Sequence, residues 1–123
     1  MNYEILNIND KEYKLTLNMA NMIQLEKKIG ENPLNKLMEM QDDKMPDFEF
    51  ICTILLYSMK KYQPKIKEME VYDLIDEYLA DEGNDIGSLI QLAFKVFEVS
   101  GYFRQPKQPL IKPEADEKPE ADE

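Results

Sequence analysis

The chain has 123 residues, with 25 acidic and 15 basic side chains and a net charge of −10 at neutral pH. This length suits one domain with a single modest core. Binding to nucleic-acid phosphates or to an anionic membrane surface requires clustered Lys and Arg, so the acidic balance disfavours both partners. An acidic excess instead keeps a protein soluble while it exposes apolar surface, and it suits a basic partner.

Cysteine and histidine usage narrows the chemistry further. Cys52 is the one cysteine and lies in an apolar run, so we expect a small buried hydrophobe and no disulfide. The chain contains no histidine, which removes the commonest metal ligand and general base. The start, MNYEILNINDKEY, lacks the basic and then apolar order of a signal peptide, and the apolar runs are too short to span a membrane. We therefore expect a cytoplasmic protein without a cofactor or a metal.

The first predicted element is a β-hairpin over residues 2–17. Two short alternating segments flank Asn9-Asp10, whose residue types tolerate the left-handed backbone of a tight turn. The side chains expected to oppose one another are Tyr3, Ile5 and Ile8 in the first segment and Tyr13, Leu15 and Leu17 in the second. An isolated hairpin is marginal in water, so we expect this one to pack against helices.

Four to five helices are predicted after the hairpin, giving a mainly α domain. Their expected ranges are 18–29, 33–38, 47–62, 67–79 and 86–99. Asn18, Asn32 and Asp85 are the expected N-caps, because their side chains can accept a hydrogen bond from the first turn. Gly30 and Gly101 are the expected stops, since glycine readily adopts the left-handed conformation that ends a helix.

Two of these helices carry an apolar stripe at helical spacing. One side of the 18–29 helix carries the apolar residues Met19, Met22, Ile23 and Ile29, together with Glu26. The stripe of the 67–79 helix contains Met69, Tyr72, Ile75 and Leu79, widened by Val71, Leu74 and Tyr78. The acidic side chains of this second segment are expected to face away from the core.

A helix with one core-facing side is apolar at about three positions in seven. The segments 47–62 and 86–99 contain more apolar residues than that. Such helices are either buried on all sides or built to meet another apolar surface. If they form a groove for a partner helix, the candidate contacts are Phe94, Phe97, Tyr102 and Phe103, with Tyr57 or Tyr62. The eight methionines of the chain would let such a surface adapt to varied partners.

Nothing in the sequence indicates catalysis. Asp73, Asp76 and Glu77 share a helical face, but their spacing is typical of a solvated acidic surface. Residues 81–92 resemble a calcium loop only superficially, because position twelve is Leu92 where a bidentate Glu is required. We therefore expect that the protein is not an enzyme.

The composition changes after residue 103. Residues 104–123 hold four of the seven prolines and end in a tandem KPEADE repeat, at 112–117 and 118–123. Low hydrophobicity, high charge and proline predict a disordered acidic tail. The predicted ordered domain is therefore 1–103.

Four segments carry a family resemblance: YKLTL at 13–17, LEKKIGENPL at 25–34, VYDLIDEYL at 71–79 and FEVSGYF at 97–103. In this order the chain resembles the tail assembly chaperones of long-tailed, siphovirus-type phages and prophages of Gram-positive bacteria. The resemblance covers about residues 1–103. It implies a helical protein that coats the apolar tape measure protein during tail assembly and is displaced as the tube polymerises.

The same resemblance implies where the protein acts and with what. The tape measure protein would be its partner in the cytoplasm of the bacterial host, it would help to recruit tail tube subunits, and it would be absent from the mature virion. In many such phages a ribosomal frameshift also yields a longer chaperone with a second domain.

Two other functions stay open. The chain could be a small virion component, such as a minor tail or head–tail protein, that self-assembles into a homo-oligomer through the same apolar surface. It could also be an acidic mimic of nucleic acid that uses residues 70–81. Presence in purified particles identifies the first, and loss of function on neutralising the acidic face identifies the second.

Overall fold

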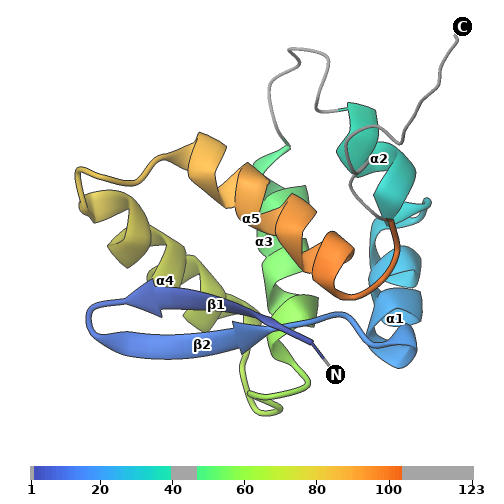
Figure 1. Ribbon diagram of the computed structural model, residues 1–123, viewed down its shortest axis with the longest axis horizontal. Coiled ribbons are helices and arrows are strands. Elements are labelled where there is room, and N and C mark those ends of the chain that lie inside the picture. The colour runs from blue at the N-terminus through green and yellow to red at the C-terminus, as the bar shows by residue number, and fades with distance from the viewer. Residues whose placement is uncertain (1, 40–46, 104–123) are drawn as a thin grey trace, which may run out of the picture.

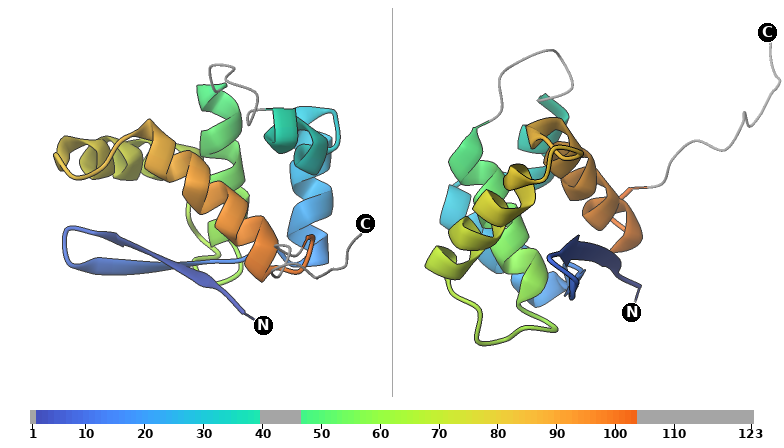
Figure 2. Two further views of the ribbon diagram at one scale, coloured as in Figure 1. Left: turned by 45° about the horizontal axis from the view of Figure 1, so that its top comes forward. Right: turned by 90° about the vertical axis from the view of Figure 1, so that its left-hand side faces the viewer.

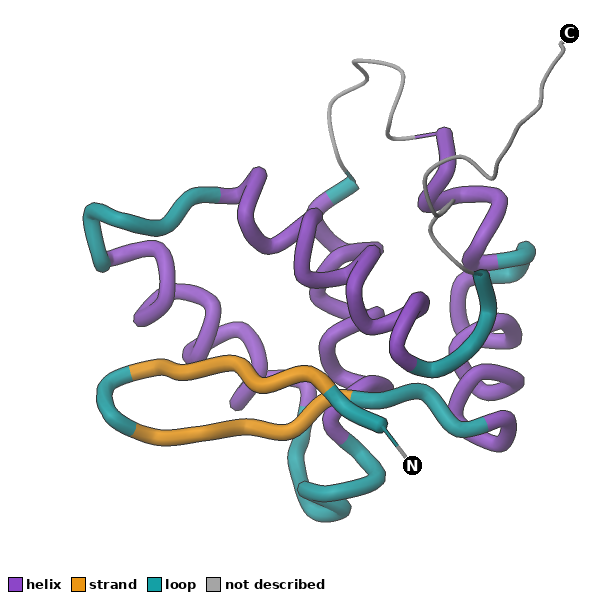
Figure 3. The backbone as a smooth tube through the Cα atoms, viewed as in Figure 1, coloured by secondary structure: helices purple, strands orange, loops and turns teal. Residues whose placement is uncertain are grey.

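The computed structural model describes residues 2–39 and 47–103, which form an N-terminal hairpin and five helices (Figure 1). The elements are β1 (Glu4–Ile8), β2 (Lys11–Leu15), α1 (Met19–Ile29), α2 (Pro33–Glu39), α3 (Phe48–Met59), α4 (Glu68–Ala80) and α5 (Ile86–Val99). The mainly α fold with an N-terminal hairpin is confirmed, and Figure 3 separates the two strands from the helices by colour. The predicted tail 104–123 and its repeat lie outside the described residues.

Short side chains begin the helices as predicted. Asn18 accepts a hydrogen bond from the N–H of Asn21 at 2.8 Å, and this satisfies one of the donors that open α1. Asn32 accepts from the first turn of α2 in the same way, through the N–H groups of Leu34 and Asn35. At α5, the carboxylate of Asp85 caps the first turn.

Glycine ends two helices. Gly30 follows α1 with φ +79°, and its N–H donates to the Glu26 carbonyl at 2.9 Å. Gly101 follows α5 with φ +96°. Residues with a Cβ rarely adopt such φ angles, whereas glycine does so without steric cost. Both predicted helix stops are therefore confirmed.

The end of α3 differs from the prediction, which extended this helix to residue 62. The helix ends at Met59, and Gln63 folds back over its last turn. The backbone N–H and the side-chain amide of Gln63 both donate to the Met59 carbonyl, at 2.8 Å and 2.7 Å. This local capping satisfies a free carbonyl and leaves residues 60–64 as a turn.

The hairpin turn is correct, but the predicted faces of its first strand are not. Asn9 and Asp10 have φ angles of +50° and +64°, as the tight turn requires. This turn pairs Leu6 with Tyr13 and Ile5 with Lys14. Leu6 therefore faces the core, while Ile5 is 41% exposed. Ile8 shares the core-facing side with Leu6 and is buried as expected, whereas Tyr3 shares the side of Ile5 and is exposed, because alternate residues of a strand face opposite sides.

Helix α3 lies at the centre of the molecule (Figure 2). It packs against α1, α4, α5 and β2, so it is covered on most sides. Eight of its twelve residues are buried: Phe50, Ile51, Thr53, Ile54, Leu55, Leu56, Ser58 and Met59. Burial on all sides, one of the two interpretations of this apolar segment, therefore describes α3.

The predicted stripes of α1 and α4 are shifted around their helices. In α1 the buried residue is Leu25, whereas Met19 is 61% exposed and Ile23 is 44% exposed. In α4 the buried residues are Val71 and Ile75, whereas Met69 is 65% exposed and Leu79 is 39% exposed. The acidic side chains of α4 face outward, as expected. The rotation of each helix about its own axis depends on where its neighbouring elements lie. The spacing of apolar residues within one helix does not specify those positions.

Candidate functional site

The end of α5 is tied to the segment that follows β2. The N–H of Leu17 donates to Ser100 Oγ at 2.8 Å, and the hydroxyl of Tyr102 donates to the Leu17 carbonyl at 3.0 Å. From the other side, the N–H of Thr16 donates to the carbonyl of Ser58 in α3 at 2.9 Å. The residues after β2 are therefore bonded both to α3 and to the FEVSGYF segment, which gives a structural reason for Ser100 and Tyr102 in that segment.

Phe97 does not lie on the surface. Its side chain is fully buried, and its ring meets that of Tyr102 edge-on at 6.2 Å between centroids. The expectation that Phe97 is available to a partner is wrong for this conformation, because its position on α5 points it at the core. Tyr102 is half-buried, and the hydrogen bond of its hydroxyl to Leu17 anchors the chain after α5.

Phe94 and Phe103 are the predicted contacts that form an accessible pair. Their rings meet edge-on with centroids 6.4 Å apart and an interplanar angle of 73°. Both are half-buried and pack against the core from outside. Because Phe103 follows Tyr102 directly, the Tyr102 hydrogen bond places the Phe103 ring over α5.

Tyr57 and Tyr62 lie in other surroundings. The Tyr62 ring meets Tyr3 of the hairpin at 5.5 Å, and the ammonium of Lys14 lies 4.9 Å from the Tyr3 ring centroid. Tyr57 is half-buried on α3, with the ammonium of Lys60 5.3 Å from its ring centroid. Within residues 2–39 and 47–103, the Phe94–Phe103 and Phe97–Tyr102 ring contacts therefore join α5 to the residues that follow it, whereas Tyr62 meets Tyr3 of the hairpin.

A row of half-buried side chains on α5 extends the Phe94–Phe103 pair. Ile86, Ile90 and Phe94 follow one another at four-residue spacing, and each is partly exposed while packing against the core. Residues four apart lie on one side of a helix, so the three form a continuous apolar strip, called here the α5 row. The site prediction from the sequence did not include Ile86 and Ile90, although their spacing from Phe94 was visible.

Cys52 is half-buried on α3 rather than fully buried as expected. Burial raises the pKa of its thiol, and the nearby carboxylates of Asp76, Glu68 and Glu49 raise that pKa further. A raised pKa keeps the thiol protonated at neutral pH, and the protonated form is a poor nucleophile. The environment of Cys52 therefore opposes reactivity.

The acidic side chains do not assemble into a metal centre in the part of the chain that the structure describes, where no group of three His, Cys, Asp or Glu residues could hold an ion. Asp73, Asp76 and Glu77 are exposed on α4, and the carboxylate of Glu77 accepts a hydrogen bond from Asn9 of the hairpin turn at 2.7 Å. No helix of the described residues is long and apolar enough to cross a membrane.

The described residues thus form a small helix-rich domain with an N-terminal hairpin. A family model described as phage tail assembly chaperone protein, TAC, matches residues 5–108. The chain belongs to the phage tail assembly chaperone family. Membership implies tail proteins as partners, and the family is in general not enzymatic. No curated protein sequence and no solved structure matches the chain.

Proposed function

We propose that this chaperone binds the tape measure protein and keeps it soluble during tail assembly, through the α5 row and Phe103. The observation that carries the proposal is the row itself: three large apolar side chains and an adjoining aromatic ring remain partly exposed on one side of α5. A partner helix with apolar anchors at i, i+4 and i+7 fits such a strip.

The energetics suit a reversible complex. Complete transfer of one large apolar side chain from water contributes about 1.5–3 kcal/mol. The members of the row are already half-buried, so each offers about half of that value to a partner. Losses of motion on association reduce the total further, which favours repeated weak contacts along a long partner. A chaperone that must later be displaced requires contacts of this strength.

The other predicted contacts take supporting places in this proposal. Phe97 supports α5 from the core, and Tyr102 positions Phe103 through its bond to Leu17. Tyr57 and Tyr62 stay proposed contacts outside the α5 row, and Tyr62 adjoins the exposed Tyr3.

Co-expression with the tape measure protein encoded nearby tests the proposal, with size exclusion and light scattering as the measurement. We expect a soluble complex with many chaperone copies per partner, and an insoluble partner when it is expressed alone. The double variant Ile90→Ser and Phe94→Ser should leave the partner insoluble. The matched control, Met69→Ser with Leu79→Ser, removes apolar side chains that are exposed on α4 and should preserve the complex.

An intact complex with the α5 double variant would contradict the proposed surface. Loss of the complex in the control alone would move the surface to α4. Circular dichroism of both variants checks that each retains its helices, so that loss of binding is not loss of folding.

The setting follows from the same proposal. The chaperone acts in the cytoplasm of a Gram-positive host of a siphovirus-type phage, helps to recruit tail tube subunits and is released before the virion is complete. A frameshifted longer form would add a second domain. Mass spectrometry of purified particles distinguishes this function from the virion-component alternative, since a chaperone should be missing from them.

A further inference from the structure

The outer edge of β2 and the residue that follows it are covered at Lys14 and Thr16 by hydrogen bonds from neighbouring segments. The N–H of Lys14 donates to Gln63 Oε1 at 3.1 Å, and the Lys14 carbonyl accepts from Gln63 Nε2 at 3.0 Å. The N–H of Thr16 donates to the Ser58 carbonyl in the same direction, away from β1. Lys14 and Thr16 therefore direct these backbone groups outward, and Leu15 between them pairs with Glu4 of β1.

The outer edge of β1 is open. In an antiparallel pair, residues directly opposite each other both point their backbone groups inward or both point them outward. Ile5 lies opposite Lys14 and Asn7 lies opposite Glu12, so Ile5 and Asn7 direct their N–H and C=O groups away from β2. Among the described residues, no hydrogen bond reaches these outward backbone groups of Ile5 and Asn7.

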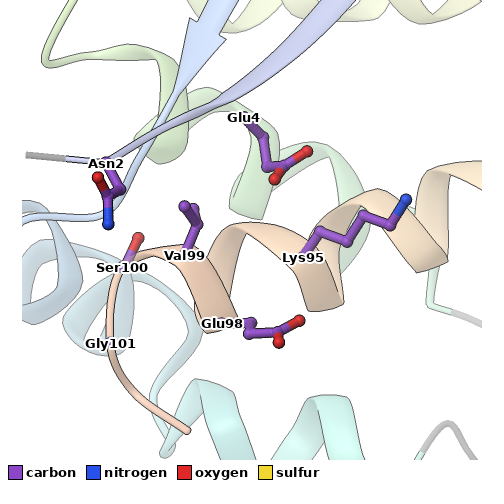
Figure 4. A pocket seen from close by; sticks show the side chains of 7 residues that line it. All are labelled: Asn2, Glu4, Lys95, Glu98, Val99, Ser100 and Gly101. Carbon is purple, nitrogen blue, oxygen red and sulfur yellow. The ribbon is translucent and has the colours of Figure 1, made fainter. Parts of the chain in front are cut away.

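This open edge borders a trough between β1 and α5. One depression of about 690 Å³ is lined by Asn2, Glu4, Lys95, Glu98, Val99, Ser100 and Gly101. A second of about 420 Å³ continues along Ile5 and Asn7 past Leu92 towards Asp81. The two share Glu4 and Lys95, so they form one trough. Figure 4 shows Glu4 reaching from β1 towards α5, and Val99 pointing from α5 back towards β1.

We propose that this trough binds an extended segment of a partner protein, which adds to β1 as a third strand. Main-chain hydrogen bonds to Ile5 and Asn7 would supply affinity, as in other cases of strand addition. The partner's side chains alternate between two faces, so one set meets Leu92 and Val99 on α5. The other determinant is charge.

The charge of the trough selects a basic segment. Among the described residues that line it, Glu4 and Asp81 carry negative charge beside the ammonium of Lys95, and the whole chain carries a net charge of −10. A second copy of this chain would meet like charge along its length, which disfavours it as the occupant. The segment that fits is therefore basic and apolar at alternate positions.

The trough lies on another side of α5 from the α5 row, since Lys95 and Phe94 are neighbours in sequence and point about 100° apart around a helix. The inference is therefore independent of the proposed tape measure contact. A result that contradicts binding at one of these surfaces would therefore not contradict binding at the other.

Titration of the ¹⁵N-labelled full chain with the peptide Lys-Val-Lys-Val-Lys-Val-Lys tests the inference by NMR. We expect chemical-shift changes at Ile5, Asn7 and Lys95, and slower amide exchange at Ile5 and Asn7. The acidic peptide Glu-Val-Glu-Val-Glu-Val-Glu should bind at least about tenfold more weakly, because its charges oppose those of the trough. Absence of shifts along β1, or equal binding of both peptides, would overturn the inference.

A pair of variants at one position separates the backbone from the side chain. Ile5→Pro removes an outward N–H without removing a bond to β2, and proline is tolerated at such an edge position. This variant should bind the basic peptide about three- to tenfold more weakly than the wild-type chain, as expected for the loss of one hydrogen bond. Ile5→Thr keeps the N–H and the branched side chain, so it should bind almost normally. Equal binding by the wild-type chain and both variants would place the peptide elsewhere.

Analytical ultracentrifugation without peptide tests the competing occupant. We expect no change in oligomeric state between the wild-type chain and Ile5→Pro. A dimer that is lost in Ile5→Pro would show that a second copy pairs with β1, and this result would overturn the assignment to a basic partner.

Discussion

Helices α3 and α5 have similar apolar sequences but different places in the molecule. Helix α3 has neighbours on four sides, namely α1, α4, α5 and β2, and it is buried over most of its length. Helix α5 packs against α3 and β1, and only Leu89, Ala93, Val96 and Phe97 are buried. The rest of α5 remains partly exposed, on one side as the α5 row and on another beside β1.

The difference teaches that the same apolar excess can have two outcomes in one small domain. In α3 most of the excess completes the core, because four other elements pack against the helix. In α5 the excess exceeds what the core covers, and the surplus side chains stay partly exposed. Only the first of the two interpretations of apolar helices, burial in the core, therefore describes α3, and it does not describe the whole of α5.

The largest expected effect comes from truncating the buried ring of α5. Phe97→Ala should lower the free energy of unfolding by about 3–5 kcal/mol, since it leaves a cavity in the core. Phe94→Ala, three residues away on the same helix, should lower it by about 1–2 kcal/mol because its ring is already half-exposed. Urea denaturation measures both. Equal losses would contradict the distinction between the core and the accessible side of α5.

A matched pair of leucines compares the two helices directly. Leu55→Ala in α3 should lower the free energy of unfolding by about 2–5 kcal/mol, because Leu55 is fully buried. Leu92→Ala in α5 should lower it by about 1 kcal/mol, because Leu92 is half-buried beside the trough. Urea denaturation of the two variants measures both losses of unfolding free energy. A larger loss for Leu92→Ala than for Leu55→Ala would contradict the distinction between the central α3 and the partly exposed α5.

A smaller effect is expected where α5 is tied to Leu17. Tyr102→Phe removes the hydroxyl that donates to the Leu17 carbonyl and should lower the free energy of unfolding by about 0.5–1.5 kcal/mol. Burial raises the pKa of Tyr102, so the unfolded chain loses this proton at a lower pH than the folded protein does. The stabilisation by this group is therefore present below pH of about 10 and is lost as pH rises through the folded-state pKa. Denaturation of both proteins across this range should show a steeper alkaline loss in the wild type.

The smallest effect concerns the one half-buried thiol of α3. Cys52 should react with iodoacetamide at pH 8 more slowly than in the urea-unfolded chain, because burial and nearby carboxylates raise its pKa. Mass spectrometry of the alkylated protein over time measures the rate. A rate equal to that of the unfolded chain would mean that this side of α3 is open to solvent.

Most boundaries of the helices and strands could be predicted from residues close along the chain. Asn18 and Asp85 cap helices through their own side chains, Gly30 and Gly101 end them with positive φ, and all four were readable from residue type. The Asn9-Asp10 turn was equally local. The end of α3 was missed although its cap is also local: the side chain of Gln63 donates to the Met59 carbonyl four residues earlier, and residue type alone did not indicate this contact.

The candidate site was predicted only in part, and for a non-local reason. Phe94 and Phe103 meet as a half-buried pair, but Phe97 lies in the core and Tyr62 lies beside the hairpin. Periodicity gives the angle between side chains of one helix, but it does not give the direction in which that helix is turned. The stripes of α1 and α4 were displaced for the same reason.

The sequence by itself determined the class of fold, the order of the elements and the turns and caps that bound them, because these depend on interactions between residues close along the chain. The tertiary structure alone decided which apolar helix is central, which side of α5 stays accessible and which edge of the hairpin remains open. These depend on how many neighbours surround each element, and packing between distant segments sets that number.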